Sequence, residues 1–301
     1  MANSIALAQK YLPLLDEIYK AESKTAILDT GAMNLEFINA NTVKIYNLAL
    51  NGLGNYSRST GFPAGDVTGT WETFTLSQDR GRSFQVDAMD EEESLNLTVG
   101  NTLAQFLRVA VIPEIDQYRF AKYAAKAKLT GTPADITSGT TDIPDLIAAA
   151  QEKMGDAEVP EEGRILYVSE LCYRALKAKI TRYLANENGV NKNIEVYDDM
   201  RVVRVPKGRF ATGATIGTDG YTQSGYAINF MIVHPSAVAQ VVKHEVPRLF
   251  SPAINQGADA WKIDYRIYHD AFTIEHGTVQ GSGESGMTNG IYLHRASTAL
   301  S

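Results

Sequence analysis

Two periodicities of hydrophobic residues divide the chain into strand-like and helix-like stretches. Alternating or β-rich runs predict strands at residues 42–50, 70–78, 83–89, 164–169, 194–205, 227–233, 260–273 and 291–293. Apolar residues three and four positions apart predict helices at residues 97–128, 143–154, 170–184 and 235–243. A short stripe from Ile5 to Tyr19 predicts either an N-terminal arm or an ordinary first helix. The mixture of elements predicts an α+β fold.

The longest helical stripe, residues 97–128, would form a rod of about 48 Å at about 1.5 Å per residue. Pro113 lies inside this stripe. A proline in a helix interior costs about 3 kcal/mol, because it removes a hydrogen bond and clashes with the preceding turn. We therefore expect a kink or a short break near residues 108–110.

Residues 54–88 have the pattern of an extended β-hairpin. The predicted strands at 70–78 and 83–89 flank an Asp79–Arg82 turn, in which Gly81 could adopt a positive φ. The segment is rich in Gly, Thr, Ser and Arg and poor in aliphatic residues, and such a hairpin is marginally stable alone in water. It therefore needs a partner, either the rest of the chain or a neighbouring subunit.

Glycine-rich and threonine-rich stretches suggest the domain organisation. Residues 131–142 read as a linker, and residues 211–225 and 277–290 as loops. Between the linker and residue 250, helices and strands alternate, with Ser169 placed to cap a helix and a turn at residues 198–199. We expect one domain at residues 131–250. A second, discontinuous domain would comprise residues 31–130 and 251–301, preceded by an arm at residues 1–30.

Composition and charge narrow the class of protein. The 301 residues are 44% hydrophobic and 21% charged, which excludes wholesale disorder. The net charge of −7 argues against a protein that coats phosphate backbones over its whole surface. The single cysteine, Cys172, excludes a disulfide within the chain, and its place on an apolar helical stripe predicts a packed thiol. No apolar run is long enough to span a membrane, and no signal peptide is visible, so we expect a cytoplasmic product.

Charges of one sign gather in separate parts of the sequence. Residues 45–121 carry ten acids against five arginines and no lysine, and residues 131–165 carry eight acids against two bases. The sign reverses at residues 166–210, which carry nine bases and five acids. Each run could be an ordinary solvated face. Alternatively, segments of opposite sign could face each other between subunits.

Motifs for catalysis or cofactor binding are weak. The G-x-G-x-x-G match at residues 281–286 has strand signals on both sides, so it reads as a turn rather than a dinucleotide site. The five histidines are scattered, and none has the spacing of a zinc protease. We therefore expect that the protein is not an enzyme and that it has neither a cofactor nor a metal site. An α/β hydrolase or a small-molecule binding protein remains the alternative from another class.

Several segments, in order along residues 5–295, resemble the major capsid protein of tailed phages, which has the Hong Kong 97-type fold. In that resemblance, residues 52–62 and 71–87 match the extended loop, and the sequence AVIPEIDQYR (residues 110–119) matches the spine helix. Residues 232–245, 248–252 and 259–272 match the later strands. The resemblance implies an N-terminal arm (1–30), an extended β-hairpin loop (about 54–88) and a long spine helix (about 97–128). It also makes residues 31–130 plus 251–301 the peripheral domain, and residues 131–250 the axial domain.

The resemblance further implies a shell subunit that assembles into hexamers and pentamers around double-stranded DNA. Four extended-loop residues would contact neighbouring subunits: Arg58, Trp71, Arg80 and Arg82. The implied partners are other copies of the chain, a portal protein and packaged DNA bound without sequence specificity. No membrane is expected as a partner. The product would assemble in the host cytoplasm and reside in the virion. An encapsulin, a shell of the same fold that encloses an enzyme, is the alternative within this fold.

Two departures from some family members give further expectations. Some members crosslink their shells through a lysine on the extended loop, but residues 45–121 contain no lysine. We therefore expect mature particles to give a single band on a denaturing gel, at the 32.9 kDa of one chain, and a covalent ladder would contradict this. Some members also begin with a long scaffolding region. The predicted arm, residues 1–30, is much shorter than such a region, so we expect a separate scaffolding protein.

Overall fold

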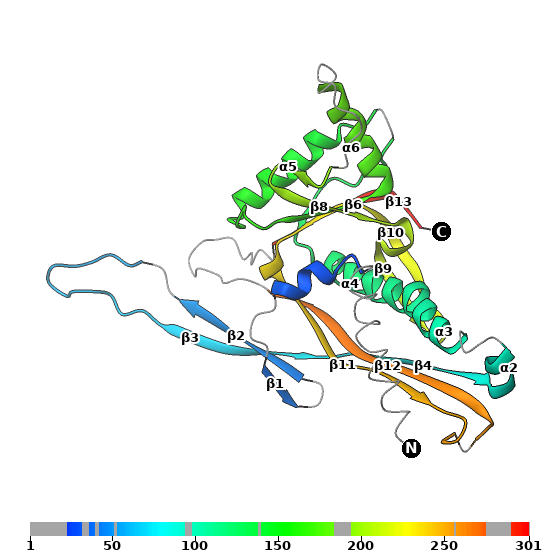
Figure 1. Cartoon of the computed structure of the whole chain (residues 1–301). Coiled ribbons are helices and arrows are strands. Elements are labelled where there is room, and N and C mark those ends of the chain that lie inside the picture. The colour runs from blue at the N-terminus through cyan, green and yellow to red at the C-terminus, as the bar shows by residue number, and fades with distance from the viewer. Residues whose placement is uncertain are drawn as a thin grey trace.

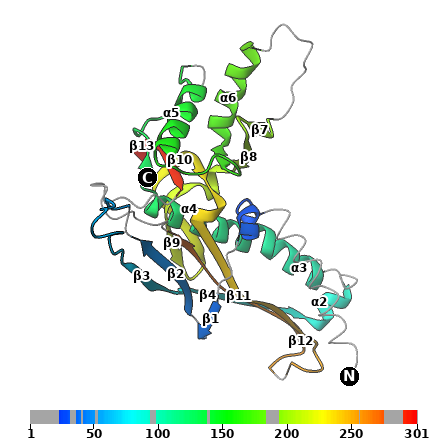
Figure 2. The same cartoon turned by 90° about the vertical axis from the view of Figure 1, so that its left-hand side faces the viewer.

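The computed structural model describes residues 23–31, 36–39, 42–50, 53–93, 98–137, 140–183, 194–255, 257–274 and 290–300. The molecule is open rather than spherical (Figures 1 and 2). An α/β unit lies at one end, a helical spine crosses the middle, and a long layer of strands lies beyond the spine. A hairpin extends from this layer away from the rest of the chain.

The α/β unit is built on a seven-stranded sheet. Its strands lie in the order β5 (Leu129–Thr130), β13 (Ile291–Ala299), β10 (Gly220–Val233), β6 (Ile165–Ser169), β8 (Met200–Val205) and β7 (Val196–Tyr197), with β9 (Ala211–Gly217) paired to β10. Helices α5 (Ile143–Asp156) and α6 (Glu170–Tyr183) cover one face (Figure 1). Because side chains alternate along a strand, Leu166 and Val168 pack beneath these helices, whereas Ile165 and Tyr167 face the spine.

Most predictions for this unit are confirmed. The predicted helices at 143–154 and 170–184 and the strand at 164–169 match α5, α6 and β6 to within two residues. The Ser169 hydroxyl accepts a hydrogen bond from the Cys172 amide at 3.3 Å, as expected of a cap. Asp198 and Asp199 have φ of 51° and 60°, which gives the tight turn between β7 and β8.

Two predictions for residues 211–250 are wrong. The expected loop at 211–225 is instead an antiparallel hairpin of β9 and β10, with Gly220 at a φ of 114° beside the turn. The expected helix at 235–243 is a single 3₁₀ turn, η4 (Pro235–Ala237), followed by the long strand β11 (Val238–Phe250). The spacing of Val238, Val241 and Val242 fits a helix as well as a strand, and pairing with β12 decides the outcome.

The spine consists of α3 (Thr98–Phe106), a π-helical turn η2 (Leu107–Val111) and α4 (Ile112–Lys126). In η2 the Ile112 amide donates to the Leu107 carbonyl, five residues earlier. The sequence predicted a break near 108–110, and this π-helical turn confirms it. The break accommodates Pro113, which has no amide hydrogen and would crowd the carbonyl four residues before it.

A second sheet lies across the spine. It contains β11, β12 (Ala260–Thr273) and β4 (Gln78–Asp87), all antiparallel, and a short helix α2 (Ala88–Glu93) follows β4. Ile263, Tyr265 and Ile267 of β12 pack against Leu107 and Ile112 of the spine in a separate apolar cluster. This cluster joins the strand layer to the spine.

The extended hairpin is formed by β2 (Thr42–Leu50) and β3 (Val67–Thr75), with β1 (Glu36–Asn39) beside β2. The predicted pairing of 70–78 with 83–89 is therefore wrong, because β3 pairs with β2 whereas β4 pairs with β12. Gly81 lies in the middle of β4 and not in a turn. A Cβ atom there would lie 2.9 Å from the Tyr265 carbonyl oxygen, so glycine permits the close approach of β12.

The sheets do not follow the proposed boundary between the peripheral and axial domains at three strands. β11, inside residues 131–250, belongs to the spine-packed sheet, whereas β5 and β13, outside that range, belong to the seven-stranded sheet. Of the predicted arm at 1–30, the structure describes residues 23–30, which include most of the 3₁₀ helix η1 (Ala26–Gly31). The earlier part of the arm and the predicted loop at 277–289 lie outside the described residues. Within the described residues, no helix is long and apolar enough to cross a membrane.

Candidate inter-subunit surfaces

The tip of the extended hairpin, residues 53–66, forms a small structured turn. Ser57 and Gly61 exchange backbone hydrogen bonds of 2.8 and 3.2 Å, and Gly61 has a φ of 80° that favours glycine. The rings of Tyr56 and Phe62 flank this turn with centroids 5.0 Å apart. The turn therefore presents two aromatic rings together.

Among the described residues, the largely exposed aromatic side chains lie on this hairpin. The exposed fraction is 60% for Tyr56, 87% for Phe62 and 58% for Trp71. Arg58 is exposed on the same turn. Clustered exposed aromatic residues beside an arginine are typical of the energetically dominant part of a protein interface.

The four predicted contact residues fall into two groups. Arg58 and Trp71 lie exposed on the hairpin, as a contact with another subunit would require. Arg80 and Arg82 lie on β4 and already have partners within the chain. Arg80 donates to both carboxylate oxygens of Glu114, at 2.7 and 3.2 Å, and Arg82 donates to Asp219 at 2.9 and 3.0 Å. These two pairs join β4 to the spine and to the β9–β10 turn.

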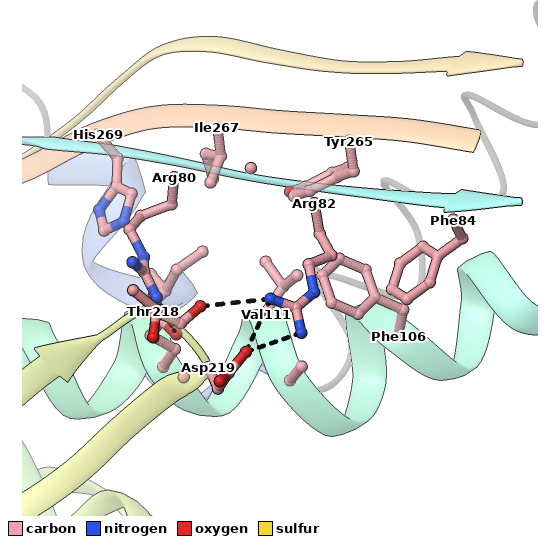
Figure 3. A pocket seen from close by; sticks show the side chains of 15 residues that line it. Arg80, Arg82, Phe84, Phe106, Val111, Thr218, Asp219, Tyr265, Ile267 and His269 are labelled. Atoms are coloured by element: carbon pink, nitrogen blue, oxygen red, sulfur yellow. Dashed lines mark hydrogen bonds and ion pairs between the residues drawn. The ribbon is translucent and has the colours of Figure 1, made fainter. Parts of the chain in front are cut away.

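A cavity of about 260 Å³ lies where these three elements meet. One end is apolar, with Phe84, Phe106 and Tyr265, whereas Arg80 and His269 line the other end (Figure 3). The ion pair of Arg82 and Asp219 lies between the two ends in this view, and it leaves both side chains substantially exposed. The cavity therefore combines aromatic walls with polar groups at one end.

His269 is the polar group of the cavity most removed from solvent, at 2% exposed. Its Nδ1 atom has no hydrogen-bond partner among the described residues. Burial lowers the pKa of this imidazole to about 4, with a further lowering from Arg119 and Arg80 against an opposing effect of Asp270. The ring is therefore neutral at neutral pH. It lies nearly perpendicular to the Tyr118 ring, with the two ring centroids 5.6 Å apart.

The neighbouring carboxylate, Asp270, secures the base of the hairpin. It accepts hydrogen bonds of 2.8 Å from the Ser77 amide, the Ser77 hydroxyl and the Tyr118 hydroxyl. Ser77 is one of the two residues that separate β3 from β4. Burial, together with Asp270, raises the pKa of Tyr118. The point where the hairpin leaves the body of the molecule is thus fixed to the spine by a buried polar cluster.

A second buried carboxylate, Asp116, holds the N-terminal segment against the spine. It is fully buried on α4 and accepts hydrogen bonds from the Ser23 hydroxyl (2.8 Å), the Lys24 amide (2.9 Å), and the Thr25 amide and hydroxyl (3.2 and 2.7 Å). Arg209 pairs with it at 3.4 Å. The buried Arg119 donates to the Thr25 hydroxyl at 2.9 Å.

Sequence reasoning missed the roles of Asp116, Arg119, His269 and Asp270. A signal was present for the first two, because they are charged residues within three positions of Ile115 and Tyr118 on the apolar stripe of the spine. Charged residues in such positions are rarely buried unless they are paired. The partners come from residues 23–29 and 209, and nothing in the sequence places those segments near the spine.

The described residues contain no cluster of His, Cys, Asp and Glu suited to a metal ion. Cys172 of α6 is fully buried in the apolar cluster that α5 and α6 share, and burial raises the pKa of its thiol to about 12. The prediction of a packed thiol is confirmed.

Comparison with known proteins shows the fold. No family model matches the sequence, and no curated protein matches it. Among solved structures, one from Mycobacterium phage Che8 aligns with a TM-score of 0.62 and 17% identity, over 85% of each chain. The capsid of cyanophage P-SCSP1u (TM-score 0.56, 13% identity) covers 87% of this chain and 85% of its own. The mature capsid of bacteriophage PhiM1 (TM-score 0.56, 13% identity) covers 86% of this chain and 83% of its own. The chain has the fold of phage capsid structures, and the predicted α+β capsid fold is confirmed.

Proposed function

We propose that this chain is the structural subunit of a phage head, which assembles into hexamers and pentamers that enclose double-stranded DNA. The observation that carries the proposal is the likeness to phage capsid structures over most of both chains. The molecular shape agrees with it, because an open tile with a projecting hairpin must complete its packing against neighbours (Figure 1).

The hairpin is the part of the subunit that we assign to contacts with neighbouring copies. Arg58 and Trp71 would contact the adjacent subunit directly. Arg80 and Arg82, which pair with Glu114 and Asp219 in the single chain, would support the surface on which a neighbouring hairpin lies. Unlike surfaces of this kind form heterologous contacts, which close into rings.

The other proposed partners follow from the same role. A shell needs a portal protein for DNA entry, and we expect a separate scaffolding protein to guide assembly. The net charge of −7 suits a container that surrounds DNA without binding its sequence. The protein would reside in the virion after assembly in the host cytoplasm.

Electron microscopy of the protein expressed alone, with sedimentation of the same sample, tests this role. We expect rings, tubes or closed shells tens of nanometres across. Contents distinguish the two shell functions, because an encapsulin would hold a cargo enzyme, and the solved structures named above give that alternative no support. A monomer of 32.9 kDa that gives no particles even when co-expressed with a scaffolding protein would contradict the proposal.

A further inference from the structure

The cavity beside His269 has room for a single large side chain. Its volume of about 260 Å³ lies below the range of about 300–1,000 Å³ typical of small-molecule pockets. Three aromatic rings line one end, and a buried imidazole with an unpartnered Nδ1 lines the other (Figure 3). A tyrosine matches this arrangement, because it combines an apolar ring with a hydroxyl that can donate to or accept from an imidazole nitrogen.

The tip of the extended hairpin carries a residue of that kind. Tyr56 is 60% exposed and is held beside Phe62 by the bridge between Ser57 and Gly61. Arg58 lies on the same turn. At the cavity, Asp219 pairs with Arg82 but keeps a side chain that is 79% exposed, so its carboxylate can accept from a second arginine. The tip therefore offers an aromatic ring, a hydroxyl and an arginine, and the cavity offers aromatic walls, an imidazole and a carboxylate to receive them.

The tip of one chain cannot reach its own cavity. From Val67 at the start of β3 to Arg82 beside the cavity, the chain runs almost straight across the molecule (Figure 1). Fifteen residues of strand at about 3.3 Å each span about 50 Å. The tip lies beyond Val67, at the far end of this run, so any contact between the tip and the cavity joins two copies.

We propose that Tyr56 of one copy inserts into the cavity between β4, the spine and the β9–β10 turn of a second copy. Its hydroxyl bonds His269 at the inner end, Phe62 packs at the entrance, and Arg58 pairs with Asp219. This inference rests on the proposed shell function and names the partner and the site of the hairpin. The contact is heterologous, so each copy offers one tip and one cavity, and the contacts can continue around a ring.

Disulfide trapping tests the contact directly. The double variant Tyr56→Cys with Ala110→Cys places one thiol on the tip and one in the cavity lining, and the native Cys172 is buried. Assembled particles, oxidised and then denatured, should give a ladder of disulfide-linked oligomers. The matched control is Tyr56→Cys with Val109→Cys, because Val109 is the neighbouring spine residue, is 66% exposed and does not line the cavity.

The outcomes separate this inference from the function on which it rests. A ladder from the Ala110→Cys pair, at least tenfold stronger than from the Val109→Cys pair, supports the contact. Particles without a ladder, or with equal ladders, overturn it and leave the shell function standing. If the wild-type protein gives no particles with a scaffold, the function itself fails and this inference fails with it.

A second measurement covers the case in which the cysteine variants do not assemble. Tyr56→Phe removes only the hydroxyl that reaches His269, and Tyr56→Ala removes the whole anchor. The subunit concentration at half-assembly should rise about three- to tenfold for Tyr56→Phe and more than thirtyfold for Tyr56→Ala. Equal assembly by wild type and Tyr56→Ala would overturn the proposal.

Discussion

The α/β unit and the extended hairpin solve the problem of burying apolar surface in opposite ways. In the α/β unit, α5 and α6 cover one face of the sheet and the spine covers the other, so two large clusters are closed within one chain. The hairpin has a small cluster at its base, around Val43 and Leu76, and its outer part leaves Tyr56, Phe62 and Trp71 exposed. The first region buries its apolar surface within one chain, whereas the second leaves aromatic surface exposed, as the proposed contact with a neighbouring copy would use.

Substitutions of buried and exposed phenylalanines should show this contrast most strongly. Phe230 is fully buried and stacks on His294 with a centroid distance of 4.9 Å. Phe230→Ala should lower the free energy of unfolding by about 3–5 kcal/mol, because it leaves a cavity in the core. Phe62→Ala should change it by less than about 0.5 kcal/mol. Urea denaturation of unassembled subunits measures both, and a comparable loss in the two variants would contradict the comparison.

The junction of the N-terminal segment with the spine should behave as part of the closed region. Asp116→Ala would leave the hydroxyls and amides of residues 23–25, and Arg209, without their buried acceptor. We expect a loss of about 3 kcal/mol, since breaking a buried charged pair leaves uncompensated polar groups. Asp116→Asn keeps one acceptor and should lose less. Equal stability of Asp116→Ala and wild type in urea would show that residues 23–25 are not held by this carboxylate.

The base of the hairpin should make stability depend on pH through His269. Its pKa falls from an ordinary value of 6.5 to about 4 on folding, so the unfolded chain binds a proton that the folded chain does not. Stability is therefore lost as the pH falls from about 6.5 to 4, by roughly 3 kcal/mol at about 1.4 kcal/mol per pKa unit. His269→Gln should remove this part of the slope, and the shift of His294, also lowered by burial, should remain. An unchanged slope between pH 6.5 and 5 in the variant would contradict the assignment.

The smallest effect is expected at the exposed pair on the cavity. The Arg82 and Asp219 side chains are 47% and 79% exposed, so Arg82→Ala should cost well under 1 kcal/mol in the unassembled subunit. Arg80 and Glu114 are only 27% and 14% exposed and form two hydrogen bonds, so Arg80→Ala should cost about 1 kcal/mol or more. Thermal unfolding of both variants measures which loses more stability. A larger loss of stability in Arg82→Ala than in Arg80→Ala would contradict this prediction.

The sequence was most informative where one local rule dominates. The strands at 42–50 and 260–273 match the observed elements residue for residue, because a β-rich or alternating run leaves little choice of conformation. The break before Pro113 was predictable for a similar reason, since proline excludes a regular helix wherever the chain goes next. The resemblance also anticipated the capsid fold.

Pairing between distant segments was beyond the sequence. Residues 83–87 could have paired with β3 next to them, but they pair with β12, which comes much later in the chain, where Gly81 allows close contact with Tyr265. Residues 211–225 look like a loop, yet they form β9 and the first part of β10, which pair with each other across a tight turn. Gln117 of the spine also bonds the backbone of Ala211 and Gly213, so a contact distant in sequence supports the hairpin.

The two sides of the proposed contact also differ in how far the sequence predicted them. Arg58 and Trp71 of the hairpin were named from the sequence, whereas Tyr56 and Phe62 were not. The signal for all of them was present, because a segment so poor in aliphatic residues cannot bury its own rings. The cavity was not visible, because Phe106, Asp219 and His269 come from three distant segments. The sequence alone thus determined that the hairpin needs a partner, since composition sets how much surface a segment can bury. The tertiary structure alone decided which residues form the receiving site, because only folding brings those segments within contact distance.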